Sequence, residues 1–285
     1  MEDARGGGGS GGVPGAAGGL GIGGIIVLAL ICWAFGIAPS VLINSTGMLG
    51  DSPSGYETPS TTGVGTPSDR TGQFVAAVLG DTEDRWKDIF AENGRSYRAP
   101  KLRLFSGVEQ SACGFAQSAM GPFYCPNDQH VYLDTSFFQD LQTRFHGCSG
   151  RACEFAEAYV IAHEVGHHVQ NLLGILPRAV QVQQNRDRAS ANHLQVMLEL
   201  QADCFAGVWA HHSQEKWKFI EPGDVEAAMQ TASAIGDDRL QRQSQGYVVP
   251  DAFTHGSSAQ RVHWFTTGLR SGVLTDCNTF AAAQL

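Results

Sequence analysis

The stretch AYVIAHEVGHHVQ, residues 158–170, contains residue types that bind a metal and use it for hydrolysis. It places His163 and His167 on either side of Glu164 in the pattern H-E-x-x-H. In a helix, residues i and i+4 lie on one face, so both imidazoles can place a nitrogen about 2.0–2.1 Å from one Zn²⁺. Glu164 is then close enough to accept a proton from a water on that metal. The spacing therefore predicts one zinc ion per chain and hydrolytic chemistry.

A catalytic zinc site needs a third protein ligand and one open position. The strongest candidate is Glu199, because it shares a predicted helix face with Asp203, four residues later. We expect Glu199 to bind the metal and Asp203 to accept a hydrogen bond from a ligand imidazole. His193 is the alternative third ligand, but its spacing from Glu199 turns it well away from that face.

These candidate ligands lie within residues 69–285, whose pattern predicts one α+β domain, mostly helical with a small β-sheet. Apolar positions at helical intervals predict a helix over residues 69–94, either continuous or broken near Gly80. Alternation predicts strands in KLRLFSG and at residues 131–133. Further helices are predicted over residues 135–145, 151–173, 190–212, 222–235 and 257–271. The two metal-binding motifs therefore fall on separate helices, which must pack together to form one site.

The segment QHVYLD, residues 129–134, has two interpretations. Zincin-type enzymes hold an extended peptide by backbone hydrogen bonds to an exposed strand edge, and this segment is a candidate for that edge. An ordinary half-buried strand fits the same pattern equally well, because alternation does not distinguish an edge from a centre.

The first 68 residues differ in composition from the rest. The high glycine content of residues 1–19 predicts a flexible tail. The composition of residues 43–68, which are rich in Ser, Thr, Gly and Pro, predicts a linker. Between them, residues 20–42 carry no charge and are long enough to cross a hydrocarbon core of roughly 30 Å as one transmembrane helix. A cleaved signal peptide is the alternative, but the apolar run is longer than usual and no clear A-x-A site follows it.

Six of the seven cysteines follow this apolar segment; only Cys32 lies inside it. Their spacing suggests two short disulfide loops and one long loop, one connectivity among 15: Cys113 with Cys125, Cys148 with Cys153, and Cys204 with Cys277. Free buried thiols in a cytosolic protein are the alternative. Disulfides form in oxidising compartments, so we expect a single-pass protein of the bacterial cytoplasmic membrane with its soluble domain on the extracytoplasmic side.

The charge balance argues against nucleic acid as a partner. The chain has 19 basic and 28 acidic residues, a formal charge of −9, and contains no block of Lys or Arg to bind a phosphate backbone. A peptide or protein substrate and the membrane, through residues 20–42, are the expected partners. No feature of the sequence indicates an oligomeric state.

Several motifs together resemble the bacterial neutral zinc metallopeptidases, a family of membrane-anchored proteins with a Gly-rich N-terminus. The resemblance covers about residues 78–265 and is carried by AYVIAHEVGHHVQNLLG, ELQADCFAGVWA, VVPDAFTHGSSAQRVHWF, VLGDTEDRWKDIF and SACGFAQSAMGPFYCPNDQHVYLD. The C-terminal part is also similar to a gluzincin pattern that ends in H-P-x-x-x-x-R. Here His255 and Arg261 keep the spacing, while Gly256 replaces the proline. The resemblance implies a zincin-like fold, zinc and endopeptidase activity, but no substrate.

The mechanism that the resemblance implies is hydrolysis with Glu164 as the general base. The developing oxyanion needs a further donor, for which His255 is the first candidate and Tyr247 the second. Arg261 is expected to position the substrate backbone or the local loop. The alternative function is a catalytically inactive, membrane-anchored zinc-binding scaffold or protein-binding module. Glu164 argues against it, because a structural zinc site is usually closed by four ligands and has no use for a base.

Overall fold

The computed structural model describes residues 1–5, 63–64, 67–117, 121–143, 153–221, 223–234, 236–238, 241 and 246–281. All of these belong to one compact unit, residues 1–6 and 62–285. The predicted transmembrane helix at residues 20–42, with Cys32, and most of the predicted tail and linker lie outside the described residues. Within the described part of the chain, no helix combines the length and apolar character needed to cross a membrane.

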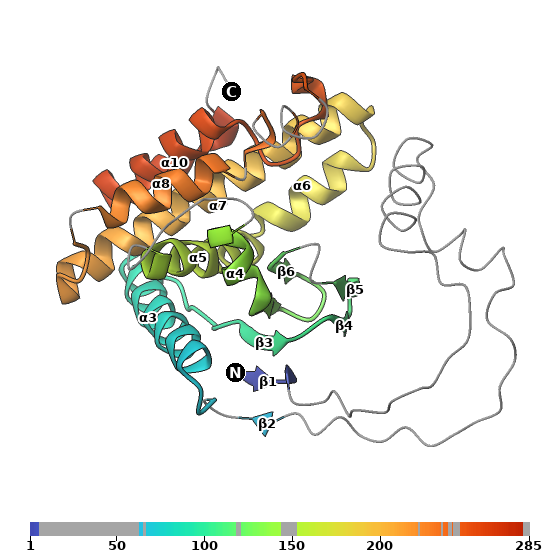
Figure 1. Ribbon diagram of the computed structural model, residues 1–285. Coiled ribbons are helices and arrows are strands. Elements are labelled where there is room, and N and C mark those ends of the chain that lie inside the picture. The colour runs from blue at the N-terminus through green and yellow to red at the C-terminus, as the bar shows by residue number, and fades with distance from the viewer. Residues whose placement is uncertain are drawn as a thin grey trace, which may run out of the picture. The chain divides into compact units, whose positions relative to one another are not determined.

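A five-stranded sheet has the strand order β2-β1-β3-β7-β6 (Figure 1). Its strands are β1 (Glu2–Asp3), β2 (Gly63–Val64), β3 (Lys101–Phe105), β6 (Phe123–Cys125) and β7 (His130–Asp134). A separate hairpin joins β4 (Val108–Ser111) to β5 (Gly114–Gln117). β7 runs parallel to β3 and antiparallel to β6, so QHVYLD occupies an interior strand of the sheet and not an edge. The edge at this end of the sheet is β6.

Seven α-helices are described: α3 (Arg70–Glu92), α4 (Ser136–Thr143), α5 (Cys153–Leu172), α6 (Ile175–Gln183), α7 (Arg188–Trp217), α8 (Asp224–Ala234) and α10 (Ser258–Ser271). Short 3-10 helices η4 (Pro250–Ala252), η5 (Leu274–Cys277) and η6 (Thr279–Ala281) lie near the C-terminus. The α+β prediction is confirmed, although α6 was not expected and α7 is longer than expected. α3 continues through Gly80, which is exposed and needs no break.

The ends of the helices follow local capping chemistry. The side chain of Asp69 accepts a hydrogen bond from the backbone of Gly72 at the start of α3, and Asp187 caps α7 in the same way. α10 begins with a capping box between Ser257 and Gln260. Such caps satisfy backbone donors that the first helical turn leaves unpaired, so these boundaries are set locally.

α5 joins the two large apolar clusters of the domain. Tyr159 and Ile161 pack with sheet residues such as Leu102, whereas Val165 and Val169 belong to the cluster that contains buried residues of α3, α7 and α10. Figure 1 shows α7, α8 and α10 side by side, with α5 between these helices and the sheet. The helix that carries H-E-x-x-H is therefore held on both sides.

The strand β1, at the start of the chain, is part of the sheet. β1 pairs in parallel with β3 and antiparallel with β2. Arg5 Nη2 lies 2.8 Å from Asp3 Oδ2 and 2.5 Å from Asp69 Oδ2, while Glu2 Oε2 lies 3.1 Å from Arg103 Nη1. These ion pairs attach the chain start to α3 and β3.

The position of β1 bears on two sequence-based expectations. Glu2–Asp3 form a paired strand, in contrast to the flexible tail expected there, while residues 6–19 of that tail lie outside the described residues. A chain that crossed a bilayer once at residues 20–42 would leave β1 and β3 on opposite sides of it. The pairing of β1 with β3 therefore argues against a single crossing at residues 20–42, which themselves lie outside the described residues.

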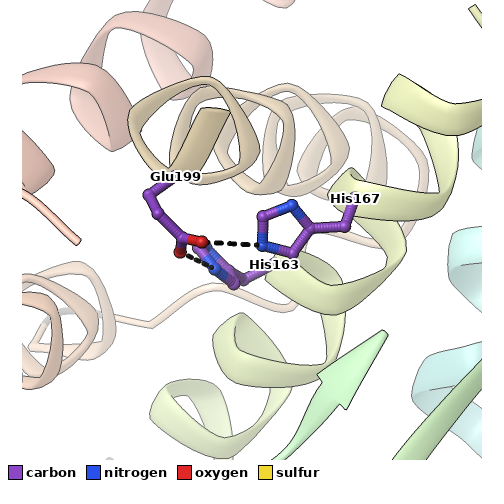
Figure 2. Close-up of side chains that lie close together, drawn as sticks. All are labelled: His163, His167 and Glu199. Carbon is purple, nitrogen blue, oxygen red and sulfur yellow. Dashed lines mark hydrogen bonds and ion pairs between the residues drawn. The ribbon is translucent and has the colours of Figure 1, made fainter. Parts of the chain in front are cut away.

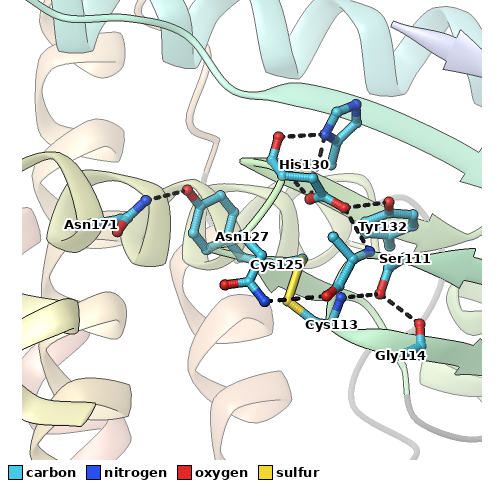
Figure 3. The surroundings of a disulfide bond; sticks show 11 residues. Ser111, Cys113, Gly114, Cys125, Asn127, His130, Tyr132 and Asn171 are labelled. Carbon is cyan, nitrogen blue, oxygen red and sulfur yellow. Dashed lines mark hydrogen bonds and ion pairs between the residues drawn. A yellow bond between two sulfur atoms is a disulfide. The ribbon is translucent and has the colours of Figure 1, made fainter. Parts of the chain in front are cut away.

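Two of the expected disulfides are present. Cys113–Cys125 connects the β4–β5 turn to β6 (Figure 3), and Cys204–Cys277 connects α7 to η5. Cys153 is also disulfide-bonded, whereas its expected partner, Cys148, lies outside the described residues. The alternative hypothesis of free buried thiols is therefore wrong for the five described cysteines.

Candidate metal centre

The structure brings His163, His167 and Glu199 together, as the motif spacing predicts. One ligand atom from each residue lies within 4.8 Å of the others. His163 Nε2 is 3.2 Å from Glu199 Oε2, and His167 Nε2 is 3.6 Å from Glu199 Oε1. Figure 2 shows the Glu199 carboxylate from α7 facing both rings on α5. The contact between α5 and α7 therefore creates the cluster.

These separations fit a zinc ion. Two ligands held at about 2.05 Å by a tetrahedral metal are about 3.3 Å apart, close to the observed N–O separations. Two imidazoles and one carboxylate form an established catalytic zinc set that leaves the fourth position to water or substrate. The donor set and its spacing therefore suit a single catalytic zinc.

Asp203 orients the ring of His163. Its Oδ1 atom lies 2.8 Å from His163 Nδ1 and accepts a hydrogen bond of 2.5 Å from the hydroxyl of Tyr159. Burial by itself lowers the pKa of His163, but the carboxylates of Asp203 and Glu199 outweigh it and raise that pKa to about 10. With Nδ1 directed at Asp203, the ring presents Nε2 to Glu199, as expected for a metal ligand.

Arg261 holds Asp203 in place. Its Nε and Nη2 atoms donate hydrogen bonds of 2.9 Å to the two carboxylate oxygens, and Nη2 also contacts the Tyr159 hydroxyl at 3.2 Å. Burial raises the pKa of Asp203, but Arg261 and His163 reverse this effect and lower the pKa to about 2. Arg261 is only 3% exposed and positions Asp203; its expected role toward the substrate backbone or the local loop stays a prediction.

Gln170 and Gln195 complete the surroundings of the cluster. Gln170 Oε1 lies 2.9 Å from His167 Nδ1, and Gln195 donates a hydrogen bond of 2.9 Å to Glu199 Oε1. Neither residue was expected from the sequence, nor was Tyr159. The spacing in the sequence could have predicted them, because each of the three lies three or four positions from a candidate ligand on the same helix and so shares its face.

Glu164 lies beside the ligands in the position of the expected base. Its side chain is 7% exposed, and burial raises its pKa although His163 and His167 oppose the effect. A buried carboxylate with a raised pKa is suited to accepting a proton near neutral pH.

His255 and Tyr247, the two candidate oxyanion donors, have different surroundings. His255 interacts electrostatically with Glu199, which places it near the cluster, whereas Tyr247 is 62% exposed. His255 Nδ1 lies 3.3 Å from Oδ1 of Asp237, a residue that sequence reasoning missed. No local spacing links Asp237 to His255, since the two come from separate segments.

Two other histidines lie outside the cluster of candidate ligands. His193, the alternative ligand, lines a different pocket of about 390 Å³ with Pro250 and Phe253. His168 is fully buried; its ring contacts the hydroxyl of Tyr124 at 3.0 Å and the carbonyl oxygen of Arg98 at 2.6 Å. His168 therefore ties α5 to β6 and to the segment before β3.

Comparison with known proteins agrees with this geometry. Over residues 1–280, the sequence matches the family described as "Putative neutral zinc metallopeptidase". The chain belongs to this family. Among the relatives, the protein of Escherichia coli named "Uncharacterized protein YpfJ" is 47% identical over 260 residues, which are 91% of this chain and 87% of that protein. "Uncharacterized protein Rv2575" of Mycobacterium tuberculosis is 45% identical over 232 residues, 78% of this chain and 75% of that protein. No solved structure matches the chain.

Proposed function

We propose that this metallopeptidase is a zinc-dependent endopeptidase that hydrolyses peptide bonds with Glu164 as general base. The observation that carries the proposal is the convergence of His163, His167 and Glu199, with Glu164 buried beside them. A structural zinc site would be closed by a fourth protein ligand. Three convergent ligands beside a carboxylate of raised pKa support catalysis instead.

Zinc bound by these three residues would supply Lewis acidity and a water whose pKa is lowered to about 7. Glu164 would accept a proton from the attacking water and donate it to the leaving amine of the peptide. His255, oriented by Asp237, donates a hydrogen bond to the carbonyl oxygen as negative charge develops there. Asp203 and Arg261 keep His163 fixed throughout.

We further propose that the substrate backbone pairs with the free edge of β6. Among the described strands, β6 ends the sheet, so no described strand of that sheet pairs with one side of its backbone. Tyr124 of β6 accepts a hydrogen bond from Asn171 of α5 and contacts His168, which fixes this edge relative to the metal-binding helix. A peptide added there gains backbone hydrogen bonds without requiring a particular sequence.

The test uses the full chain, measuring zinc content by mass spectrometry and cleavage of an unstructured protein such as casein. We expect one zinc per chain in the wild type and in Glu164→Gln, with cleavage lowered by roughly 10²- to 10⁴-fold in the variant. Glu154→Gln is the matched control, because Glu154 lies on the same helix but is exposed and pairs with Arg70. Glu199→Ala should lose both zinc and cleavage.

The same experiment separates the enzyme from the inactive scaffold. Stoichiometric zinc with no cleavage by the wild type, across several unstructured proteins, would favour the scaffold. Cleavage that is unaffected by Glu164→Gln would point to a contaminating protease and contradict the proposed mechanism.

We also propose that the domain acts outside the cytoplasm, attached to the cytoplasmic membrane by residues 20–42. The disulfides Cys113–Cys125 and Cys204–Cys277 support an oxidising compartment, and the uncharged character of residues 20–42 supports membrane contact. Because β1 and β3 share one sheet, the attachment must leave the first five residues and the domain on the same side.

Fractionation and protease protection test this arrangement. Deleting residues 20–42 should move the protein from the membrane to the soluble fraction. With tags fused to both ends of the full chain, protease added to spheroplasts should digest both tags. A protected N-terminal tag beside a digested C-terminal tag would contradict the shared side, and two protected tags would contradict the external location.

A further inference from the structure

Gln170 lies one turn after His167 on α5 and is completely buried. Its Nε2 atom donates hydrogen bonds to the carbonyl oxygen of Leu198, at 2.7 Å, and to Gln201 Oε1, at 3.1 Å. Because a backbone carbonyl oxygen can only accept, the amide nitrogen must face α7. The opposite end of the amide, Oε1, therefore faces His167.

This orientation decides which nitrogen of His167 carries a proton. Gln170 Oε1 lies 2.9 Å from His167 Nδ1 and can only accept, so Nδ1 is the donor. A neutral imidazole protonated at Nδ1 has its lone pair on Nε2, the atom that faces Glu199 at 3.6 Å. The amide therefore selects the tautomer that binds a metal through Nε2.

Gln170 is itself held from the C-terminal end of the chain. The Gln201 amide that accepts its hydrogen bond donates through Nε2 to the carbonyl oxygen of Cys277, at 2.8 Å. The disulfide Cys204–Cys277 ties this carbonyl to α7, and Thr279 donates a hydrogen bond of 2.7 Å to the carbonyl oxygen of Met197. A buried series of amides thus runs from the disulfide to the ring of His167.

The two ligand histidines have unlike partners. His163 is oriented by the carboxylate of Asp203, which is neutralised by Arg261, whereas His167 is oriented by a neutral amide. The site already holds the carboxylates of Glu164 and Glu199, so an amide fixes the second ring without adding another buried negative charge.

We propose that Gln170 is a positioning residue for His167, and that Gln201 and the Cys277 carbonyl hold Gln170, so that the C-terminal segment contributes to zinc affinity. This inference rests on the proposed zinc site. It extends the site to a segment that shares no motif with the metal ligands.

The test measures the zinc dissociation constant of the full chain by competition with a chelator, and the absorption spectrum of the cobalt-substituted protein. Gln170→Met keeps side-chain length but removes the acceptor, and should weaken zinc binding by about 10- to 100-fold with an altered cobalt spectrum. Gln214→Met is the matched control on α7; Gln214 accepts a hydrogen bond from the backbone of Ile220, at the far end of that helix. It should leave both readouts unchanged.

Gln201→Met provides an independent variant if Gln170→Met folds poorly. It should weaken zinc binding in the same direction, and the double variant should bind no more weakly than Gln170→Met alone, because both changes release the same ring. Unchanged zinc affinity in Gln170→Met and Gln201→Met, or fully additive effects, would overturn the inference. A wild type that binds no zinc would instead overturn the proposed function on which it rests.

Discussion

Asp237 fixes the loop that carries His255 with one carboxylate oxygen and faces its ring with the other. Asp237 Oδ2 accepts hydrogen bonds from the backbone nitrogens of Thr254, His255 and Gly256, at 2.6, 2.5 and 3.1 Å. Asp237 Oδ1 lies 3.3 Å from His255 Nδ1. The ring, whose side chain is 51% exposed, is thus held at a defined orientation by a partner distant in sequence.

This relationship predicts an effect on the pH profile. Burial lowers the pKa of His255, but Asp237 and Glu199 outweigh it and raise the pKa above its usual value of 6.5. The protonated ring therefore persists above pH 6.5, and activity that depends on it is lost as pH rises through the raised pKa. Asp237→Asn removes the charge, so the alkaline limb of kcat/KM should move to lower pH while zinc content stays the same. An unmoved limb would exclude His255 as the titrating donor.

The buried Arg261–Asp203 pair predicts a large loss of stability. Arg261→Met removes the partner of a carboxylate that is fully buried, and breaking such a pair costs about 3–5 kcal/mol in the free energy of unfolding. Urea unfolding of the chelated protein measures this cost without a contribution from zinc. Arg70→Met is the control, because the Arg70–Glu154 pair is exposed and should contribute little. Similar losses in both variants would contradict the assigned role of Arg261.

The close crossing of α7 and α10 predicts that Gly207 cannot carry a side chain. A Cβ atom at Gly207 would collide with the carbonyl oxygen of Phe265, which is backbone and cannot move aside alone. Gly207→Ala should therefore lower the free energy of unfolding by about 1–3 kcal/mol. It should also displace α10, which carries Arg261, from Asp203. Gly80→Ala, in the exposed middle of α3 with open space around it, should instead stabilise by about 0.5–1 kcal/mol. Thermal unfolding of both variants tests the contrast.

His168 predicts a loss of stability in mild acid. Burial lowers its pKa to about 4, so the folded chain keeps the ring neutral while the unfolded chain takes up a proton below about pH 6.5. Stability associated with this residue is present above about pH 6.5 and falls by about 3 kcal/mol as pH approaches 4. His168→Gln cannot titrate and should be less sensitive to pH over this interval. Parallel curves of unfolding free energy against pH for the two proteins would refute this role.

The sequence by itself determined the features that depend on neighbouring residues. H-E-x-x-H and the spacing of Glu199 from Asp203 are properties of single helices, so the expected grouping with His163 agrees with the structure. Apolar periodicity likewise placed α3, α5, α7 and α10, because the buried stripe of a helix is a local property.

Only the tertiary structure decided which distant segments meet. Nothing in the local pattern assigns Asp237 to His255, Gln201 to Cys277, or β1 to β3, because each contact closes a loop whose two ends carry no shared spacing. For the same reason, the sequence did not indicate that Arg261 is buried against Asp203. Local periodicity fixes the face on which a side chain lies, whereas packing decides what that face meets.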